Sequence, residues 1–209
     1  SNNSGASFDS ADDVDASNRV INSCPASGPH GTILDSVLYT TFMSGVGGSE
    51  KIYVSKSIVN DSLTFQEKQL VSPTATVAQN YPRIASFNDL VLVAWTESVS
   101  NNYDIYTAYA FNGDLLQMTT THQQANSTVN GIQTNPDIRI ENGNIHLVYQ
   151  DIGNGQVIYR KGKLGFTGLE ENQAETELLY PNPISVGQLL HLPSVFMNST
   201  VEWYDVTGK

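Results

Sequence analysis

The chain is poor in cysteine, in basic residues and in long apolar runs, and each shortage excludes a class of protein. Cys24 is the single cysteine among 209 residues, so we expect no internal disulfide and no paired cysteines for zinc or redox chemistry. No apolar run approaches the roughly 18 residues of a membrane-spanning helix. Ten Lys and Arg against 21 Asp and Glu give a net charge of −11, which excludes nucleic acid as a partner because its phosphates would be repelled.

The sequence repeats itself at a period of about 53 residues. Each copy holds an Ile-Tyr pair, preceded by an apolar segment that ends in an aromatic residue. The Ile-Tyr pairs lie at residues 52–53, 105–106 and 158–159, the aromatics are Phe42, Trp95 and Tyr149, and prolines lie upstream at 25, 82 and 136. Residues 82–97 and 136–151 align without a gap. Such self-similarity indicates an array of similar units.

Each copy has the pattern of short β-strands. Residues 90–95 form a continuously apolar run of β-forming residues, which predicts a strand covered on both faces. A second strand is predicted over residues 104–111 after a polar turn at 98–102, and a hairpin turn is predicted at 112–114, followed by Leu115–Met118. No segment shows a sustained helical period with caps, so we expect few helices.

A unit of about 50 residues with four short antiparallel strands has the size of a propeller blade. The motif Pro-x-Ile, apolar run, Trp-x-Glu and Asn-Tyr-Asp-Ile-Tyr resembles the sialidase-type (BNR-like) propeller repeats of secreted bacterial proteins. The resemblance covers residues 25–164 and implies an all-β fold with about three four-stranded antiparallel blades. Residues 1–24 are an acidic, Ser- and Asp-rich segment or a partial blade. A β-sandwich built from similar hairpins is the alternative.

Propellers close with about four to eight blades, so we expect further blades before Ser1 in a parent protein. The chain begins with Ser1 and shows no signal-peptide core, and we therefore expect a processed protein or a piece of a longer one.

The composition changes after the repeats. Residues 165–177 are acidic and polar, as in a linker. From residue 178 the motifs follow in order: Tyr180-Pro181-Asn182-Pro183, two leucines, and a final Val-Glu-Trp-Tyr-Asp-Val-Thr-Gly-Lys. Together with Gly-Leu-Glu-Glu-Asn at 168–172, this series resembles the C-terminal sorting domain (type A) of type IX secretion substrates.

The resemblance implies that residues 178–209 are the truncated start of an Ig-like β-sandwich that acts as a sorting signal. The residues that match it are Tyr180, Pro181, Asn182, Pro183, Leu190, Leu192, Tyr204, Asp205, Gly208 and Lys209. It also implies export by way of the periplasm to the cell surface, with the type IX translocon and an outer-membrane shuttle barrel as partners.

Candidates for catalysis are few. The Asp box and arginine cluster of true sialidases are absent, and Arg83 and Arg139 do not occupy matching positions in the repeat. Glu97 and Asp151 are equivalent carboxylates of neighbouring copies, and their repetition favours a structural role over acid–base catalysis. We therefore expect no catalytic residue in this chain, and a protein that is not an enzyme.

No metal or cofactor is expected. Asp13-x-Asp15-x-Ser17 is a fragment of a calcium-loop pattern that lacks the glycine and distal glutamate, so a solvated acidic segment is favoured. The four histidines show no zinc-ligand spacing, and His146, which replaces Leu92 of the sister copy, is expected within a sheet.

Three serines follow an aspartate and precede an apolar residue, a pattern that resembles O-glycosylation acceptors in bacteria with type IX export. They are Ser10, Ser36 and Ser62. Chance in a serine-rich chain is the alternative explanation.

These observations predict a secreted, cell-surface protein whose repeats are a binding or adhesion module for a surface glycan or protein. The alternatives are the propeller region of a secreted, sialidase-like glycan-active enzyme with catalytic residues outside this chain, and a peptidase-associated propeller.

Overall fold

The computed structural model describes residues 11–15, 28–45, 49–59, 63–66, 68–72, 77–99, 102–127 and 130–163. The chain divides into two units, Ser1–Gly162 and Lys163–Lys209, and all described residues except Lys163 belong to the first. Cys24, the linker at 165–177 and the sorting segment at 178–209 lie outside the described residues. Among those described, no helix has the length and apolar character needed to cross a membrane.

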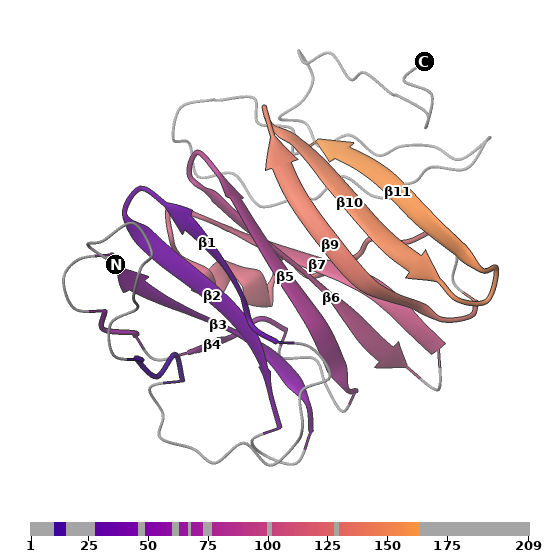
Figure 1. Ribbon diagram of the computed structural model, residues 1–209, viewed down its shortest axis with the longest axis horizontal. Helices are drawn as coiled ribbons and strands as arrows, with labels where there is room; N and C mark the ends of the chain where they lie inside the picture. The colour runs from indigo at the N-terminus through magenta and orange to yellow at the C-terminus, as the bar shows by residue number, and fades with distance from the viewer. Residues whose placement is uncertain are drawn as a thin grey trace. The chain divides into compact units, whose positions relative to one another are not determined.

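The described part is built from strands, which form separate antiparallel sheets (Figure 1). The first sheet has the order β1 (His30–Leu34), β2 (Val37–Ser44), β3 (Lys51–Ile58), β4 (Gln69–Leu70). The second has the order β5 (Gln79–Phe87), β6 (Leu90–Val99), β7 (Asn102–Phe111), β8 (Gln123–Gln124). The third contains β9 (Gln133–Glu141), β10 (Asn144–Asp151) and β11 (Gln156–Lys163).

The prediction of four-stranded antiparallel sheets, one for each repeat, is confirmed for the first two copies, and the third shows three described strands. The first strands β1, β5 and β9 pack beside one another in succession. Three sheets in this arrangement are propeller-like, and they differ from the two facing sheets of a β-sandwich. The described residues do not close into a complete propeller.

Two-residue turns between the first and second strands recur with the period seen in the sequence. They lie at Asp35-Ser36, Asn88-Asp89 and Asn142-Gly143, and the first residue of each has a φ of 50°, 52° and 50°. Asn, Asp and Gly tolerate this left-handed backbone, which matches the twist of a hairpin. Ser36, a predicted glycosylation acceptor, is exposed in the first turn; Ser10 and Ser62 lie outside the described residues.

The second sheet is covered on both faces. Every residue from Leu90 to Trp95 is at most 5 % exposed, because β5 and β6 contact β9 of the third sheet while β5 also contacts β2 and β3 of the first. The strand predicted from the apolar run is therefore confirmed, together with its burial on two sides.

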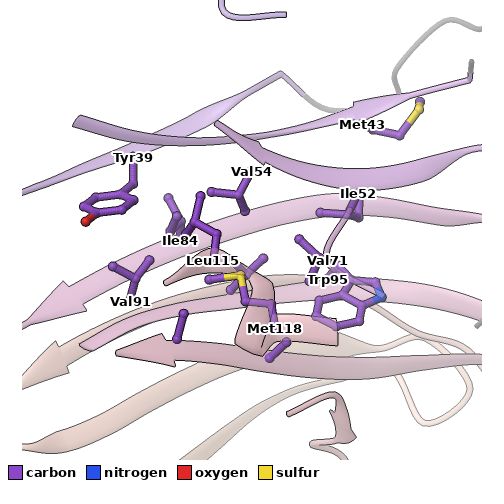
Figure 2. Close-up of a cluster of buried hydrophobic side chains, with 13 residues drawn as sticks. Tyr39, Met43, Ile52, Val54, Val71, Ile84, Val91, Trp95, Leu115 and Met118 are labelled. Atoms are coloured by element: carbon purple, nitrogen blue, oxygen red, sulfur yellow. The ribbon is translucent and has the colours of Figure 1, made fainter. Parts of the chain in front are cut away.

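A hydrophobic core fills the space between the first and second sheets (Figure 2). Its side chains from the first sheet are Tyr39, Met43, Ile52 and Val54, and those from the second are Ile84, Val91, Val93, Trp95, Ala108 and Ala110, joined by Val71, Leu115 and Met118. Their removal from water is the main favourable term that holds the two sheets together.

The segment after β7 departs from a simple strand continuation. The predicted turn is present at Asn112-Gly113, but Leu115–Thr119 forms a 3₁₀ helix, η1. The Asp114 side chain accepts a hydrogen bond from the Leu116 amide at 3.2 Å. Leu115 and Met118, three residues apart, then lie on one face and enter the core.

Gly113 offers a test of how closely the second sheet's turn approaches the first sheet. Its φ is +69°, and an added Cβ would lie 2.8 Å from the Tyr39 hydroxyl. Gly143 has a similar φ of +75° with nothing within 4 Å. We expect Gly143→Ala to cost about 1–2 kcal/mol through backbone strain alone, and Gly113→Ala to cost about 1–3 kcal/mol more through the clash. Urea denaturation of both variants measures the difference, and equal costs would contradict this packing.

Candidate functional site

The strands β5 and β9 each carry a bulge at the same place in the repeat. The register of β5 against β6 slips between Asn80 and Arg83, and that of β9 against β10 slips at the equivalent position. The residues at the slips, Tyr81 and Asn135, have left-handed backbones with φ of 54° and 52°. Each directly precedes a proline.

Polar side chains gather at and beside these two bulges. The Arg83 Nε lies 3.8 Å from the Asp137 Oδ1, and their side chains are 31 % and 65 % exposed. The Asn135 Nδ2 donates to the Gln150 Oε1 at 2.8 Å. We call Tyr81, Arg83, Asn135, Asp137 and Gln150 the bulge cluster. Its members come from the second and third sheets; Asn135, Asp137 and Gln150 are exposed, and the other two are half-buried.

A tyrosine with positive φ is a strained conformation, which costs about 1–3 kcal/mol and persists only where its surroundings impose it. Bulges redirect side chains and are common beside functional sites. The sequence contains a feature that predicts these bulges, because a proline inside a strand is typical of a bulge or of an edge strand. Pro82 and Pro136 are landmarks of the repeat, but no bulge was predicted beside them.

Each bulged strand begins with a buried glutamine that joins two sheets. The Gln79 Nε2 donates to the Glu97 Oε2 at 2.8 Å, and its Oε1 accepts from the Ile52 amide of the first sheet at 3.1 Å. Gln79 and Glu97 are 0 % and 4 % exposed. The side chain thereby satisfies a backbone donor of one sheet and a carboxylate of the next.

The third sheet repeats this arrangement with one intermediate. The Ile105 amide donates to the Asn126 Oδ1 at 2.8 Å, and the Asn126 Nδ2 lies 3.3 Å from the Gln133 Oε1, which accepts. Gln133 in turn hydrogen-bonds the carboxylate of Asp151. We call the two glutamine–carboxylate pairs, Gln79–Glu97 and Gln133–Asp151, the seam pairs.

Asp151 is held in its charged form by hydrogen bonds. Those from Asn154 are the largest influence and lower the pKa of Asp151 below its usual range, with a smaller contribution from Gln133, while partial desolvation opposes them. Because the folded-state pKa is depressed, this contribution to stability is present above the ordinary pKa and is lost as the pH falls through the folded value.

Glu97 has further neighbours in the second sheet. The Trp95 Nε1 donates to its Oε2 at 3.1 Å, and the His122 Nε2 lies 3.8 Å from the same oxygen. Burial lowers the pKa of Lys51 in the adjacent sheet, and the charge of Glu97 opposes that shift. Glu97 and Asp151 therefore make buried structural contacts, as their repetition in the sequence predicts.

Other residues singled out in the sequence are placed as follows. His146 lies within β10, and its Nδ1 is 2.9 Å from the Tyr159 hydroxyl, so its position in a sheet is as predicted.

The expectation that Asp15 is solvated is wrong. Its carboxylate pairs with Lys68 at 2.5 Å, and the side chains of Asp15 and Lys68 are 13 % and 7 % exposed. Arg139 lies 4.0 Å from Glu141, whereas Arg83 lies 3.8 Å from Asp137, so the two arginines contact different carboxylates.

A separate groove of about 390 Å³ lies where the first sheet meets the turn that follows β7. It is lined by Val37, Tyr39, Lys56, Ser57, Ile58, Thr64, Gln66, Asn112 and Gly113. The Lys56 Nζ donates to the Gly113 carbonyl at 2.7 Å, so this ammonium already holds the turn.

No family model and no curated protein matches the chain. Among solved structures it is similar to a GH43 endo-arabinanase from Bacillus licheniformis, with 13 % identity over 64 % of this chain and 50 % of that one and a TM-score of 0.45. It is also similar to the catalytic domain of a GH62 α-L-arabinofuranosidase from Coprinopsis cinerea, with 12 % identity over 65 % of this chain and 45 % of that one and a TM-score of 0.43. A third similar structure is an endo-arabinase from Bacteroides thetaiotaomicron VPI-5482, with 13 % identity over 66 % of this chain and 56 % of that one and a TM-score of 0.40.

The chain spans about half the length of these structures. All three structures are enzymes by name, and these matches contradict the expectation that the chain is not an enzyme. At this level of identity the likeness concerns the fold, and no catalytic residue is carried over from them.

The seam pairs can be tested by removing one glutamine. Gln79→Ala would leave the Glu97 carboxylate and the Ile52 amide without this partner in a buried place, so we expect a loss of about 2–4 kcal/mol in unfolding free energy. The matched control is Gln156→Ala, at an exposed residue of β11, which should change stability by less than about 0.5 kcal/mol. Equal effects in chemical denaturation would show that Gln79 does not join the sheets.

Proposed function

We propose that the repeats are the propeller region of a glycan-active protein and that the bulge cluster contacts the glycan. The observation that carries this proposal is the pair of equivalent bulges in neighbouring first strands, at Tyr81 and Asn135, with a strained backbone at Tyr81. A bulge in one strand could be local, but a bulge repeated in two sheets beside an exposed polar cluster is typical of a site that the fold maintains for a ligand.

The chemistry of the bulge cluster suits a polyhydroxylated ligand. Asn135 and Gln150 provide amide donors and acceptors, and Arg83 and Asp137 provide a charged donor and acceptor that are partly exposed. Tyr81 adds an aromatic ring that can cover the apolar C–H face of a sugar while its hydroxyl bonds to the polar rim. A few placed polar groups around an aromatic surface are the usual composition of small-ligand sites.

Hydrolysis of a glycosidic bond ordinarily requires two carboxyl groups on opposite sides of the bond. Asp137 supplies one exposed carboxylate in the bulge cluster. We propose that the remaining catalytic groups of the parent protein lie outside this chain, and that the cluster positions the saccharide for them.

We also propose that residues 178–209 direct export through the type IX pathway to the cell surface. The ordered motifs from Tyr180-Pro181-Asn182-Pro183 to Gly208-Lys209 support this proposal. The translocon and its shuttle barrel would then be partners of the C-terminal segment, while the repeats meet glycans outside the cell.

Glycan binding can be measured by calorimetry with the full chain against soluble polysaccharides, including linear arabinan. We expect Tyr81→Asn, which keeps a residue tolerant of positive φ but removes the ring, to weaken binding about tenfold, equivalent to about 1.4 kcal/mol. The control is Tyr159→Asn, at a tyrosine that is 48 % exposed on β11, which should bind as the unaltered chain does. Unchanged affinity in a folded Tyr81→Asn variant, or no binding to any glycan by the full chain, would overturn the site.

Export is tested by deleting residues 178–209, together with any continuation, from the parent protein in a bacterium with a type IX system. We expect the shortened protein to accumulate in the periplasm, because the signal that the translocon reads is gone. Cell-surface protease accessibility measures the outcome. Normal surface display of the shortened protein would refute the sorting role.

A further inference from the structure

Lys68 and His122 occupy equivalent positions in the first and second sheets. Each directly precedes the short fourth strand of its sheet, at Gln69 and Gln123 respectively. Each also lies by a pair of stacked aromatic rings that face one another across the second and third strands. The pairs are Phe42 with Tyr53, at a centroid distance of 6.1 Å, and Trp95 with Tyr106, at 6.2 Å.

In the first sheet this position holds a permanent cation with a complete set of partners. The Lys68 ammonium lies 4.6 Å from the Tyr53 ring centroid and 5.9 Å from that of Phe42. It also donates to the Asp15 carboxylate at 2.5 Å. A cation over aromatic faces with a carboxylate beside it is a stable arrangement.

In the second sheet the equivalent residue lacks such a partner. The His122 ring stacks on Tyr106 at 4.8 Å and on Trp95 at 5.6 Å. Its Nε2 is buried and makes no hydrogen bond. The nearby Glu97 oxygen, 3.8 Å away, already accepts from Gln79 and Trp95.

Several charged or titratable groups lie on the elements packed around this ring. Glu97 of β6 favours a charged imidazole. The same carboxylate also interacts with Lys51 of β3, whose ammonium donates to the Val77 carbonyl at 2.5 Å. From β7, Tyr106 stacks on the ring, and Asp104 is engaged by Asn102 and Asn126. Burial is the largest influence and lowers the pKa of His122, with the Glu97 charge opposing it.

We propose that His122 is an acid-sensitive latch, which on protonation draws the Glu97 carboxylate away from Gln79 and so weakens the junction between the first and second sheets. The proton comes from solvent and adds to a ring nitrogen. Both ring nitrogens are then donors, and a shift of Glu97, whose Oε2 lies 3.8 Å away, gives the buried Nε2–H an acceptor. Gln79, which also holds the Ile52 amide, loses its carboxylate partner in that shift.

The direction of the pH effect follows from the lowered pKa of His122. The unfolded chain takes up this proton near the ordinary value of 6.5, whereas the folded chain takes it up at lower pH. Stability is therefore complete above the ordinary pKa and falls as the pH drops below it, down to the folded value. In that window the unfolding equilibrium constant rises by up to about tenfold per pH unit.

The test uses the full chain with Trp203→Phe, which leaves Trp95 as the one tryptophan of the two in the sequence. Trp95 stacks on His122, so its fluorescence should change as the imidazole is protonated. We expect the fluorescence transition below about pH 6.5 and a fall of the urea midpoint between about pH 7.5 and about pH 5.5. A transition above the ordinary histidine value, or no fall of the midpoint, would overturn the proposal.

Three variants in the same background separate the latch from general acid effects. His122→Gln, which cannot be protonated, should remove most of the pH dependence, whereas His146→Gln, at the histidine of β10, should retain it. His122→Lys, which copies the first sheet, should have a lower urea midpoint at neutral pH and little further loss on acidification. An equal pH dependence in His122→Gln and in the unaltered chain would refute the latch. Should His122→Gln not fold, NMR titration of the His122 ring in the unaltered sequence tests the latch instead. A titration midpoint above about pH 6.5 would contradict the proposal.

Discussion

The buried glutamine side chains that begin β5 and β9 make the contacts on which the junctions between the sheets depend. A charged carboxylate inside a protein costs several kcal/mol unless donors satisfy it. Gln79 satisfies Glu97 and at the same time accepts from the Ile52 amide of the neighbouring sheet. Apolar packing holds the first two sheets together, and the Gln79 side chain adds a directional polar contact between them.

The bulge cluster depends on the same contact. Tyr81 comes two residues after Gln79, and its strained backbone persists because the strand is anchored to β6 by the Gln79–Glu97 pair and to the first sheet by the hydrogen bond between Gln79 and the Ile52 amide. The third sheet repeats the order with Gln133 and Asn135. The exposed polar side chains are thereby carried by strands rather than by loops, which gives the proposed ligand site a more rigid support.

Local patterns predicted much of the fold. The period, the hairpin turns and the strand at residues 90–95 follow from residue types at fixed spacing, and the structure confirms them. The bulge at Tyr81, the 3₁₀ helix after Gly113 and the Asp15–Lys68 pair were not predicted, because each depends on which distant segment lies opposite. The expectation that the chain is not an enzyme was drawn from absent sialidase motifs, and such an absence excludes one enzyme family rather than catalysis in general.

Amide hydrogen exchange at Ile52 and Ile105 tests the central claim most directly, because these two backbone donors reach side-chain acceptors that belong to the junctions between sheets. If the glutamine side chains join the sheets through Ile52 and through Asn126, both amides should exchange only through global unfolding, as slowly as the amides in the middle of β6. Exchange of Ile52 and Ile105 as fast as that of the hairpin turns would contradict the account.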